Sequence, residues 1–300
     1  MNISELFQRG EFVVSAEVGP PKGTNIDHLV EEAKTYLSGV TAVNVTDNQS
    51  SVMRLGSLAT CKVLKDEGLT PIYQLTCRDR NRIALQSDLL SAAMLGIENL
   101  LLLTGDHTKM GDHPQAKPVF DLDSVSLIHT VKQLESGCDL GGNELVGEPP
   151  KFAKGAVVSP CSDSVDAQLA KMERKVMAGA DYFQTQAVFE PEKFISFMEK
   201  AKQFGKPVQL GIIIPKSVGM ARFMNANVAG IHVPESMIDE LKADKEKTKA
   251  GITGVEIAAR IIKECKPYCQ GIHIMALGWE SKVPDLSLIH ISEPTRLQLI

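Results

Sequence analysis

The sequence has few of the features that would place it outside ordinary globular proteins. Of its 300 residues only 5% are aromatic, and its six cysteines are scattered along the chain. Scattered cysteines in a chain of this length do not indicate a disulfide framework. No apolar run approaches the roughly 20 residues that cross a bilayer, and no signal-peptide pattern opens the chain. These absences predict a cytoplasmic protein with no membrane span.

Familiar cofactor and metal motifs are also missing. The sequence contains no Gly-x-Gly-x-x-Gly after a strand, no Walker loop and no Gly-x-Ser-x-Gly elbow. Cys265 and Cys269 lack further ligands at a suitable spacing, as do His107 and His113, so no metal site is predicted. The net charge of −5, with no stripe of Lys and Arg, argues against a nucleic-acid partner. An anionic ligand would therefore need a local basic cluster.

What the sequence does contain is an alternation of short apolar runs and longer helix-period segments. Near-continuous apolar runs are typical of parallel strands buried on both faces. The expected strands cover residues 12–17, 42–46, 71–76, 99–104, 155–159, 182–186, 208–214 and 271–277. The expected helices lie near residues 26–37, 52–66, 80–95, 122–136, 164–179, 191–203 and 252–266. Eight such units favour a single-domain (β/α)8 TIM barrel over an open doubly wound sheet.

Three segments depart from this alternation. The crossover at 217–247 is longer, and Pro234 is expected to divide it into two helices, with a charged face or loop at 239–249. Residues 105–120 are non-periodic and predict a long ligand-binding loop after the fourth strand. The segment from Ser287 to Arg296 looks like translated sequencing-adapter text. We therefore expect the barrel domain to span 1–283, and 284–300 to be a non-native, poorly packed tail.

Polar residues at the carboxyl ends of the strands are the candidates for chemistry, because the active sites of parallel barrels form there. The candidates are Glu17, Thr46, Asp47, Gln74, Thr76, Thr104, Asp106, Ser159 and Gln186. Glu17 ends an apolar strand, and a carboxyl group without hydration can serve as a general acid near neutral pH. A lone Glu at a strand end is, however, more often an ion-pair partner at the barrel rim.

Each of the other candidates has both a ligand-binding and a purely structural interpretation. Asp106 follows Gly105, which allows a ligand to approach the backbone closely but is equally typical of a simple turn. The amide of Gln186 fits the edge of a pterin or flavin, although satisfied core amides are common. Arg174 and Lys175 could meet a phosphate, or could form a solvated helix face.

At these residues the chain resembles the methylenetetrahydrofolate reductase family, from about Val13 to Gly278. The resemblance is closest to the short bacterial and acetogen enzymes. It rests on AEVGPP at 16–21, QLTCRD at 74–79, LTGD at 103–106, ERKVMAGA at 173–180 and QTQ at 184–186. Each motif alone is weak, but their order and their placement at strand ends are specific.

The resemblance implies an oxidoreductase of one-carbon metabolism and methionine biosynthesis. Reduced flavin would convert 5,10-methylenetetrahydrofolate to 5-methyltetrahydrofolate, with Glu17 as the general acid and Asp106 as a second catalytic acid near flavin and folate. Gln186 and Glu17 would bind the pterin. The flavin-binding positions implied by the resemblance are Thr46, Gln74, Thr104, Gly105, Asp106, Lys171, Arg174 and Lys175.

The chain departs from many relatives around the flavin. Gln74 replaces a common His, and Thr104 replaces a common Arg. The resemblance implies FAD as the cofactor, and these departures leave FMN open as the alternative. The resemblance leaves the electron donor open between NAD(P)H and a partner subunit that carries zinc or iron–sulfur clusters, and it implies an oligomer. Two other hypotheses stay open: a proline-dehydrogenase-like flavin barrel, and a non-catalytic folate-binding subunit of a methyl-transfer complex.

Overall fold

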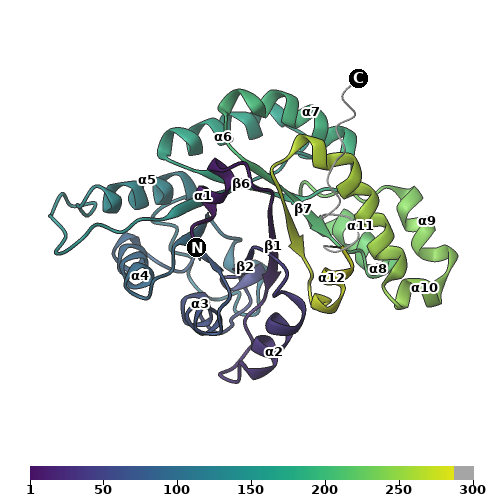
Figure 1. The fold of residues 1–300 in the computed structure, drawn as a ribbon, viewed down its shortest axis with the longest axis horizontal. Coiled ribbons are helices and arrows are strands. Elements are labelled where there is room, and N and C mark those ends of the chain that lie inside the picture. The colour runs from purple at the N-terminus through teal and green to yellow at the C-terminus, as the bar shows by residue number, and fades with distance from the viewer. Residues whose placement is uncertain (287–300) are drawn as a thin grey trace.

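Eight parallel strands close into a barrel in chain order (Figure 1). The computed structural model describes residues 1–286. The strands are β1 (Val13–Val18), β2 (Ala42–Val45), β3 (Pro71–Thr76), β4 (Asn99–Leu103), β5 (Ala153–Val158), β6 (Tyr182–Ala187), β7 (Val208–Ile213) and β8 (Gly271–Met275). Strand β8 pairs with β1 and so closes the barrel, with Ser15 opposite His273. The predicted single-domain (β/α)8 fold is confirmed.

Helices surround the barrel and fill the crossovers between its strands (Figure 1). The main ones are α2 (Asp27–Tyr36), α3 (Ser57–Asp66), α4 (Arg82–Met94), α5 (Ser124–Glu135), α6 (Val165–Ala178), α7 (Pro191–Ala201) and α11 (Ile252–Cys265). Between β7 and α11 lie α8 (Val218–Asn227), α9 (Glu235–Ala243) and α10 (Lys245–Lys249). Pro234 directly precedes α9, as expected. The charged segment 239–249 falls mainly in α9 and α10, where Lys242 and Lys249 form ion pairs with acids three residues away.

Side-chain alternation along the strands creates two separate apolar clusters. The outward residues of β3, Tyr73 and Leu75, belong to the large cluster between strands and helices. The inward residue Ile72 belongs to a smaller cluster at the amino-terminal end of the barrel. Gln74 and Thr76 continue the inward-facing series toward the carboxyl end of β3. The same alternation therefore places polar side chains at the mouth of the barrel, the end formed by the carboxyl ends of the strands.

A short helix that the sequence patterns do not predict closes the other end of the barrel. Helix α1 (Ile3–Gln8) begins at Asn2, whose side chain accepts a hydrogen bond from the Ser4 amide. Ile3 and Leu6 are buried in the smaller apolar cluster. The ring of Phe7 lies 5.7 Å from the ring of Tyr182, measured between centroids. The helix therefore seals the amino-terminal end of the barrel.

We expect Ile3→Ala to lower the free energy of unfolding by about 2–4 kcal/mol, because it removes fully buried apolar volume from this seal. Chemical denaturation would measure the change. Ile83→Ala is the matched control, since that side chain is 73% exposed, and it should change stability by less than about 0.5 kcal/mol. Equal losses in the two variants would contradict the assignment of α1 as a structural seal.

The remaining differences from the sequence-based prediction lie at segment ends. Helix α3 begins at Ser57 rather than near 52, because residues 48–56 form an irregular loop that includes the 3-10 turn η1 (Gln49–Ser51). Residues 105–120 form the predicted long loop, with the 3-10 turn η2 (Thr108–Met110). Helix α12 (Val283–Leu286) crosses the boundary expected at 283, and residues 287–300 of the expected tail lie outside the described residues. No helix within 1–286 has the length and apolar character to cross a membrane.

Candidate active site

Glu17 lies in the carboxyl-terminal half of β1 and is 9% exposed. Its two carboxylate oxygens face side chains from different elements. Oε1 accepts a hydrogen bond from Gln49 Nε2 at 2.9 Å, and Oε2 accepts one from Gln74 Nε2 at 3.3 Å. Both partners are amides, and within residues 1–286 no Lys or Arg side chain forms an ion pair with Glu17. The rim ion-pair interpretation of Glu17 therefore does not describe this geometry.

An imidazole beneath Glu17 extends the cluster into the barrel. His273 Nε2 lies 3.7 Å from Glu17 Oε2, and His273 Nδ1 lies 3.0 Å from Ser15 Oγ. His273 and Ser15 are almost completely buried. The sequence analysis missed both residues and also Gln49. The alternation of β8 was the available signal, because it places His273 on the inward face, but its partners lie more than 200 positions away in the chain.

A second buried carboxylate stands next to this cluster without entering it. Asp47 Oδ2 accepts hydrogen bonds from the Thr76 amide and hydroxyl, at 2.9 and 2.8 Å. The same oxygen lies 2.8 Å from Arg80 Nη1. These contacts tie the loop after β2 to the end of β3. Asp47 therefore has a structural role in shaping the mouth.

Hydrogen bonds fasten the loop that carries Asp106 to the loop after β2. Ser51 Oγ lies 3.1 Å from the backbone oxygens of both Asp106 and His107, and these two acceptors share its one hydroxyl proton. The Met53 amide donates to Asp112 Oδ1 at 3.0 Å, and Lys22 pairs with the same carboxylate group. Asp106 itself is exposed. Its side chain is thus open to solvent on a loop whose backbone is held in place.

Four further candidates lie near the carboxyl ends of the strands, and two of them have features that suit a ring-shaped ligand. Gly105 has φ +90°, and a Cβ there would lie 3.1 Å from Thr76 Cβ, so the backbone approaches β3 more closely than a larger residue allows. The Thr46 hydroxyl is buried without a hydrogen-bond partner among the described residues. Such an orphaned polar atom is consistent with a ligand that supplies the missing bond. Thr104 Oγ1 instead accepts from the Ser124 amide at 3.1 Å, and Gln186 is partly buried at the end of β6.

The three basic candidates on α6 differ in orientation. Lys171 and Arg174 are exposed. Arg174 also lines a shallow cavity of about 410 Å³ with residues of α5. Lys175 turns inward, and its Nζ donates to the Val157 backbone oxygen at 2.6 Å. Burial, reinforced by the positive charge of Lys171, lowers the pKa of Lys175 to about 8. An anionic ligand beside Lys175 would favour its charged form and so offset the cost of burying that charge.

This depressed pKa predicts a pH-dependent stability. Between pH 8 and about 10.5 the unfolded chain holds a proton on Lys175 that the folded chain has lost, so stability rises with pH through that window. Lys175→Met lacks this contribution. The free energy of unfolding of this variant should be about 2–3 kcal/mol higher than that of the wild type at pH 7, and the difference should disappear by about pH 10. Denaturant titrations across the window, with the exposed Lys200→Met as control, would measure it; a constant difference would refute the assignment.

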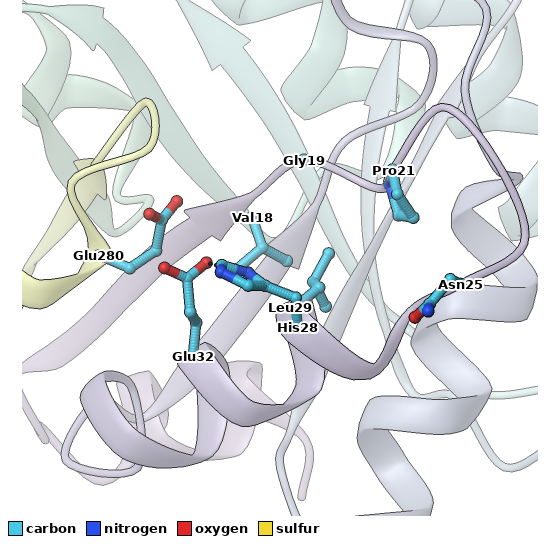
Figure 2. A pocket seen from close by; sticks show the side chains of 8 residues that line it. All are labelled: Val18, Gly19, Pro21, Asn25, His28, Leu29, Glu32 and Glu280. Atoms are coloured by element: carbon cyan, nitrogen blue, oxygen red, sulfur yellow. Dashed lines mark ion pairs between the residues drawn. The ribbon is translucent and has the colours of Figure 1, made fainter.

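A cavity of about 300 Å³ lies beside the rim, between α2 and the loop after β8 (Figure 2). His28 pairs with Glu32 there, with His28 Nδ1 at 3.1 Å from Glu32 Oε2, and Glu280 faces them. Its two carboxylates make it unsuitable for phosphates or for the acidic tail of a folate. Glu17 is not among the residues that line it. The cavity therefore adjoins the cluster around Glu17 without including it.

The cysteines do not offer a nucleophile at this mouth. Burial raises the pKa of Cys77 to about 12 and those of Cys161 and Cys269 to about 11, so these thiols stay protonated near neutral pH. Within residues 1–286 no group of three or more His, Cys, Asp or Glu side chains is arranged to hold a metal ion. The arrangement favours proton transfer and ligand orientation by carboxyl, amide and imidazole groups.

A closed parallel barrel that gathers a buried carboxylate, amides and an imidazole near the carboxyl ends of its strands has the architecture of a (β/α)8-barrel enzyme. The chain belongs to the methylenetetrahydrofolate reductase family, because the family model of that description matches residues 2–287. The resemblance seen in the sequence motifs is thereby confirmed, as is the prediction of an enzyme of this family.

Individual relatives agree with the family match. The 5,10-methylenetetrahydrofolate reductases of Escherichia coli K12 and Pectobacterium carotovorum are each 26% identical over 265 residues, 85% of this chain and 82% of theirs. Methylenetetrahydrofolate reductase 2 of Schizosaccharomyces pombe is 27% identical over 239 residues, which span 76% of this chain but 37% of the yeast protein.

Solved structures share the fold at low sequence identity. A Clostridium thermocellum protein described as binding two copies of 5-methyl-5,6,7,8-tetrahydrofolic acid has a TM-score of 0.66 at 14% identity, covering 97% of this chain and 98% of its own. Oxaloacetate acetylhydrolase has a TM-score of 0.55 at 11% identity, covering 96% of this chain and 83% of its own. These likenesses concern the barrel architecture alone.

Proposed function

We propose that this chain reduces 5,10-methylenetetrahydrofolate to 5-methyltetrahydrofolate at the carboxyl-terminal mouth of its barrel. The observation that carries the proposal is the buried Glu17, held between Gln49 and Gln74 above His273. Family membership supports the substrate, and the folate named for the C. thermocellum neighbour is compatible with it. A flavin bound at the mouth would supply the hydride that this reduction requires.

Glu17 is proposed to act as the general acid. It would donate a proton to a ring nitrogen of the substrate, so that the carbon–nitrogen bond of the imidazolidine ring breaks and an iminium carbon forms. That carbon then accepts the hydride and becomes the methyl group. Because Glu17 is 9% exposed, water has little access to the proton before transfer. Asp106, on the fastened loop, would orient the folate and the flavin edge, and Gln186 would bind the pterin.

The flavin is proposed to lie among Thr46, Gln74, Thr104, Gly105 and Asp106. The unpartnered hydroxyl of Thr46 and the close backbone approach at Gly105 support this placement. Lys171, Arg174 and Lys175 would meet the phosphates, and the buried position of Lys175 is explained if an anion pairs with it. Three cations on one helix favour the two phosphates of FAD over the single phosphate of FMN.

The remaining features of the proposal concern the cellular setting. The product is a methyl donor for methionine biosynthesis, so the protein would act in cytoplasmic one-carbon metabolism. We propose NAD(P)H, or a partner subunit with zinc or iron–sulfur clusters, as the electron donor, and an oligomer as the working form.

Reconstitution with FAD or FMN tests the proposal. The holoprotein should absorb near 450 nm, lose that band on reduction, and regain it when methylenetetrahydrofolate is added without air. FMN binding in preference to FAD would overturn the cofactor assignment. Bleaching by proline would instead favour a proline-dehydrogenase-like enzyme. Tight binding of methyltetrahydrofolate without any bound flavin would favour a non-catalytic folate-binding subunit.

A further inference from the structure

A belt of polar side chains crosses the barrel directly beneath Glu17. It consists of five almost fully buried residues from five strands: Ser15, Asn44, Gln184, Gln209 and His273. Barrel interiors are usually filled by branched apolar side chains, and buried polar groups are costly unless they are hydrogen-bonded. The fold alone does not require such a belt, and its hydrogen bonds fix the orientation of each member.

The backbone fixes the orientation of the first amide. Gln209 Nε2 lies 3.2 Å from the backbone oxygens of both Val13 and Ile272. Carbonyl oxygens only accept hydrogen bonds, so the amide nitrogen must face them, and Gln209 Oε1 must face away. That oxygen accepts from Gln184 Nε2 at 3.0 Å.

The orientation of Gln209 determines the orientations of the other two amides, Gln184 and Asn44. Since Gln184 turns its nitrogen to Gln209, its Oε1 is left as an acceptor, and Asn44 Nδ2 donates to it at 2.8 Å. Asn44 Oδ1 completes the pair by accepting from Gln184 Nε2 at 3.2 Å. Each amide in the belt therefore has one orientation, set in sequence from the backbone of β1 and β8.

This order determines where the Ser15 hydroxyl must donate its proton. Ser15 Oγ lies 3.2 Å from Gln209 Nε2 and 3.4 Å from Gln184 Nε2, and both of these groups are donors. In the described part of the chain, the remaining side-chain group within hydrogen-bond distance of Ser15 Oγ is His273 Nδ1, at 3.0 Å, and it can accept when its ring nitrogen is unprotonated. The hydroxyl donates to Nδ1, so the neutral imidazole carries its proton on Nε2, the atom that faces Glu17.

We propose that Gln184 and Gln209 are positioning residues that fix His273 as its Nε2–H tautomer and thereby aim a donor at Glu17. This deepens the proposed function, on which its catalytic meaning rests, by naming the support of the general acid. Gln49, Gln74 and His273 then present three N–H groups to one carboxyl group. Gln49 and Gln74 hold the Glu17 carboxyl group on one side, and His273 faces it from the belt on the other.

Nitrogen NMR of the full-length protein labelled at histidine tests the tautomer directly. His273→Gln identifies the signal among the seven histidines, and spectra are compared at a pH above which that signal no longer shifts, so that the ring is neutral. We expect the wild type to have an unprotonated Nδ1 and a protonated Nε2. A protonated Nδ1, or an equal mixture of tautomers, would overturn the proposal whether or not any variant folds.

Gln209→Met tests the role of the belt. It removes the N–H donor that lies 3.2 Å from Ser15 Oγ, and the backbone oxygens of Val13 and Ile272 lose that donor too. The Ser15 hydroxyl is then no longer restricted to His273 Nδ1, so a mixture of tautomers is expected. Methyltetrahydrofolate formation should fall about 10-fold, as is usual when support of a functional group is lost. Tyr182→Phe is the control: it removes a buried 2.9 Å hydrogen bond to the Leu100 backbone oxygen elsewhere in the barrel and should leave the tautomer unchanged. An unchanged tautomer in Gln209→Met would overturn the assigned role.

These outcomes separate the inference from the proposed function. The NMR measurement needs neither flavin nor folate, so a protein that fails to reduce folate can still show the expected tautomer. Conversely, if the protein reduced folate but His273 carried its proton on Nδ1, the proposed function would be supported and the inferred role of the belt would be wrong.

Discussion

Glu17→Gln is expected to slow the reduction of methylenetetrahydrofolate by about 10²–10⁴-fold, the range lost when a general acid is removed. Glutamine preserves the size of the side chain and can still contact Gln49 and Gln74, but it carries no acidic proton. Flavin binding and flavin reduction by an artificial donor should be nearly unchanged, because neither needs that proton. Stopped-flow spectroscopy of the two half-reactions measures both expectations.

The control for Glu17→Gln is Glu32→Gln in the neighbouring acidic cavity (Figure 2). It removes a carboxylate close to the mouth but outside the cluster, and folate reduction should stay within about twofold of the wild type. If Glu17→Gln reduced folate at a near-normal rate, Glu17 could not be the acid, and the proposed mechanism would fail.

Gly111→Ala is expected to lower the rate of folate reduction by about 10–100-fold through displacement of the loop that carries Asp106. A Cβ at position 111 would lie 1.8 Å from the Ser51 backbone oxygen. Backbone atoms cannot rotate away as a side chain can, so the two loops must separate. The Ser51 hydrogen bonds to Asp106 and His107 would then break.

The stability of Gly111→Ala should fall by about 1–3 kcal/mol, as is typical of overpacking. Thermal unfolding and steady-state rates together measure the two effects. Gly23→Ala is the matched control, since a Cβ there meets nothing within 4 Å and its backbone does not require glycine. Folate reduction at wild-type rates in Gly111→Ala would mean that the fastened loop does not position the site.

The strands could be predicted because the barrel imposes a simple demand on them. Both faces of a parallel strand are buried, so each one appears as a short apolar run, and the predicted order was the observed order. Helix α1 could not be predicted in this way. It has six residues with two buried apolar side chains, and its stability comes from contacts with the barrel floor.

Within the candidate site, local sequence identified some groups and not their partners. Glu17 and Gln74 were recognisable as polar ends of apolar strands. Their contact with His273, and the dependence of His273 on Ser15, join the first and last strands and follow only from closure of the barrel. The sequence also did not show how the basic residues of α6 differ: adjacent residues on a helix point about 100° apart, and Lys175 turns toward β5 while Arg174 is exposed.

The most direct test of the account is a crystal structure of the protein with a flavin and 5-methyltetrahydrofolate. We expect the flavin at the carboxyl-terminal mouth and the pterin against it, in contact with Glu17 and Gln186. A folate bound instead in the acidic cavity between α2 and the loop after β8, or anywhere out of reach of the Glu17 carboxyl group, would contradict the account.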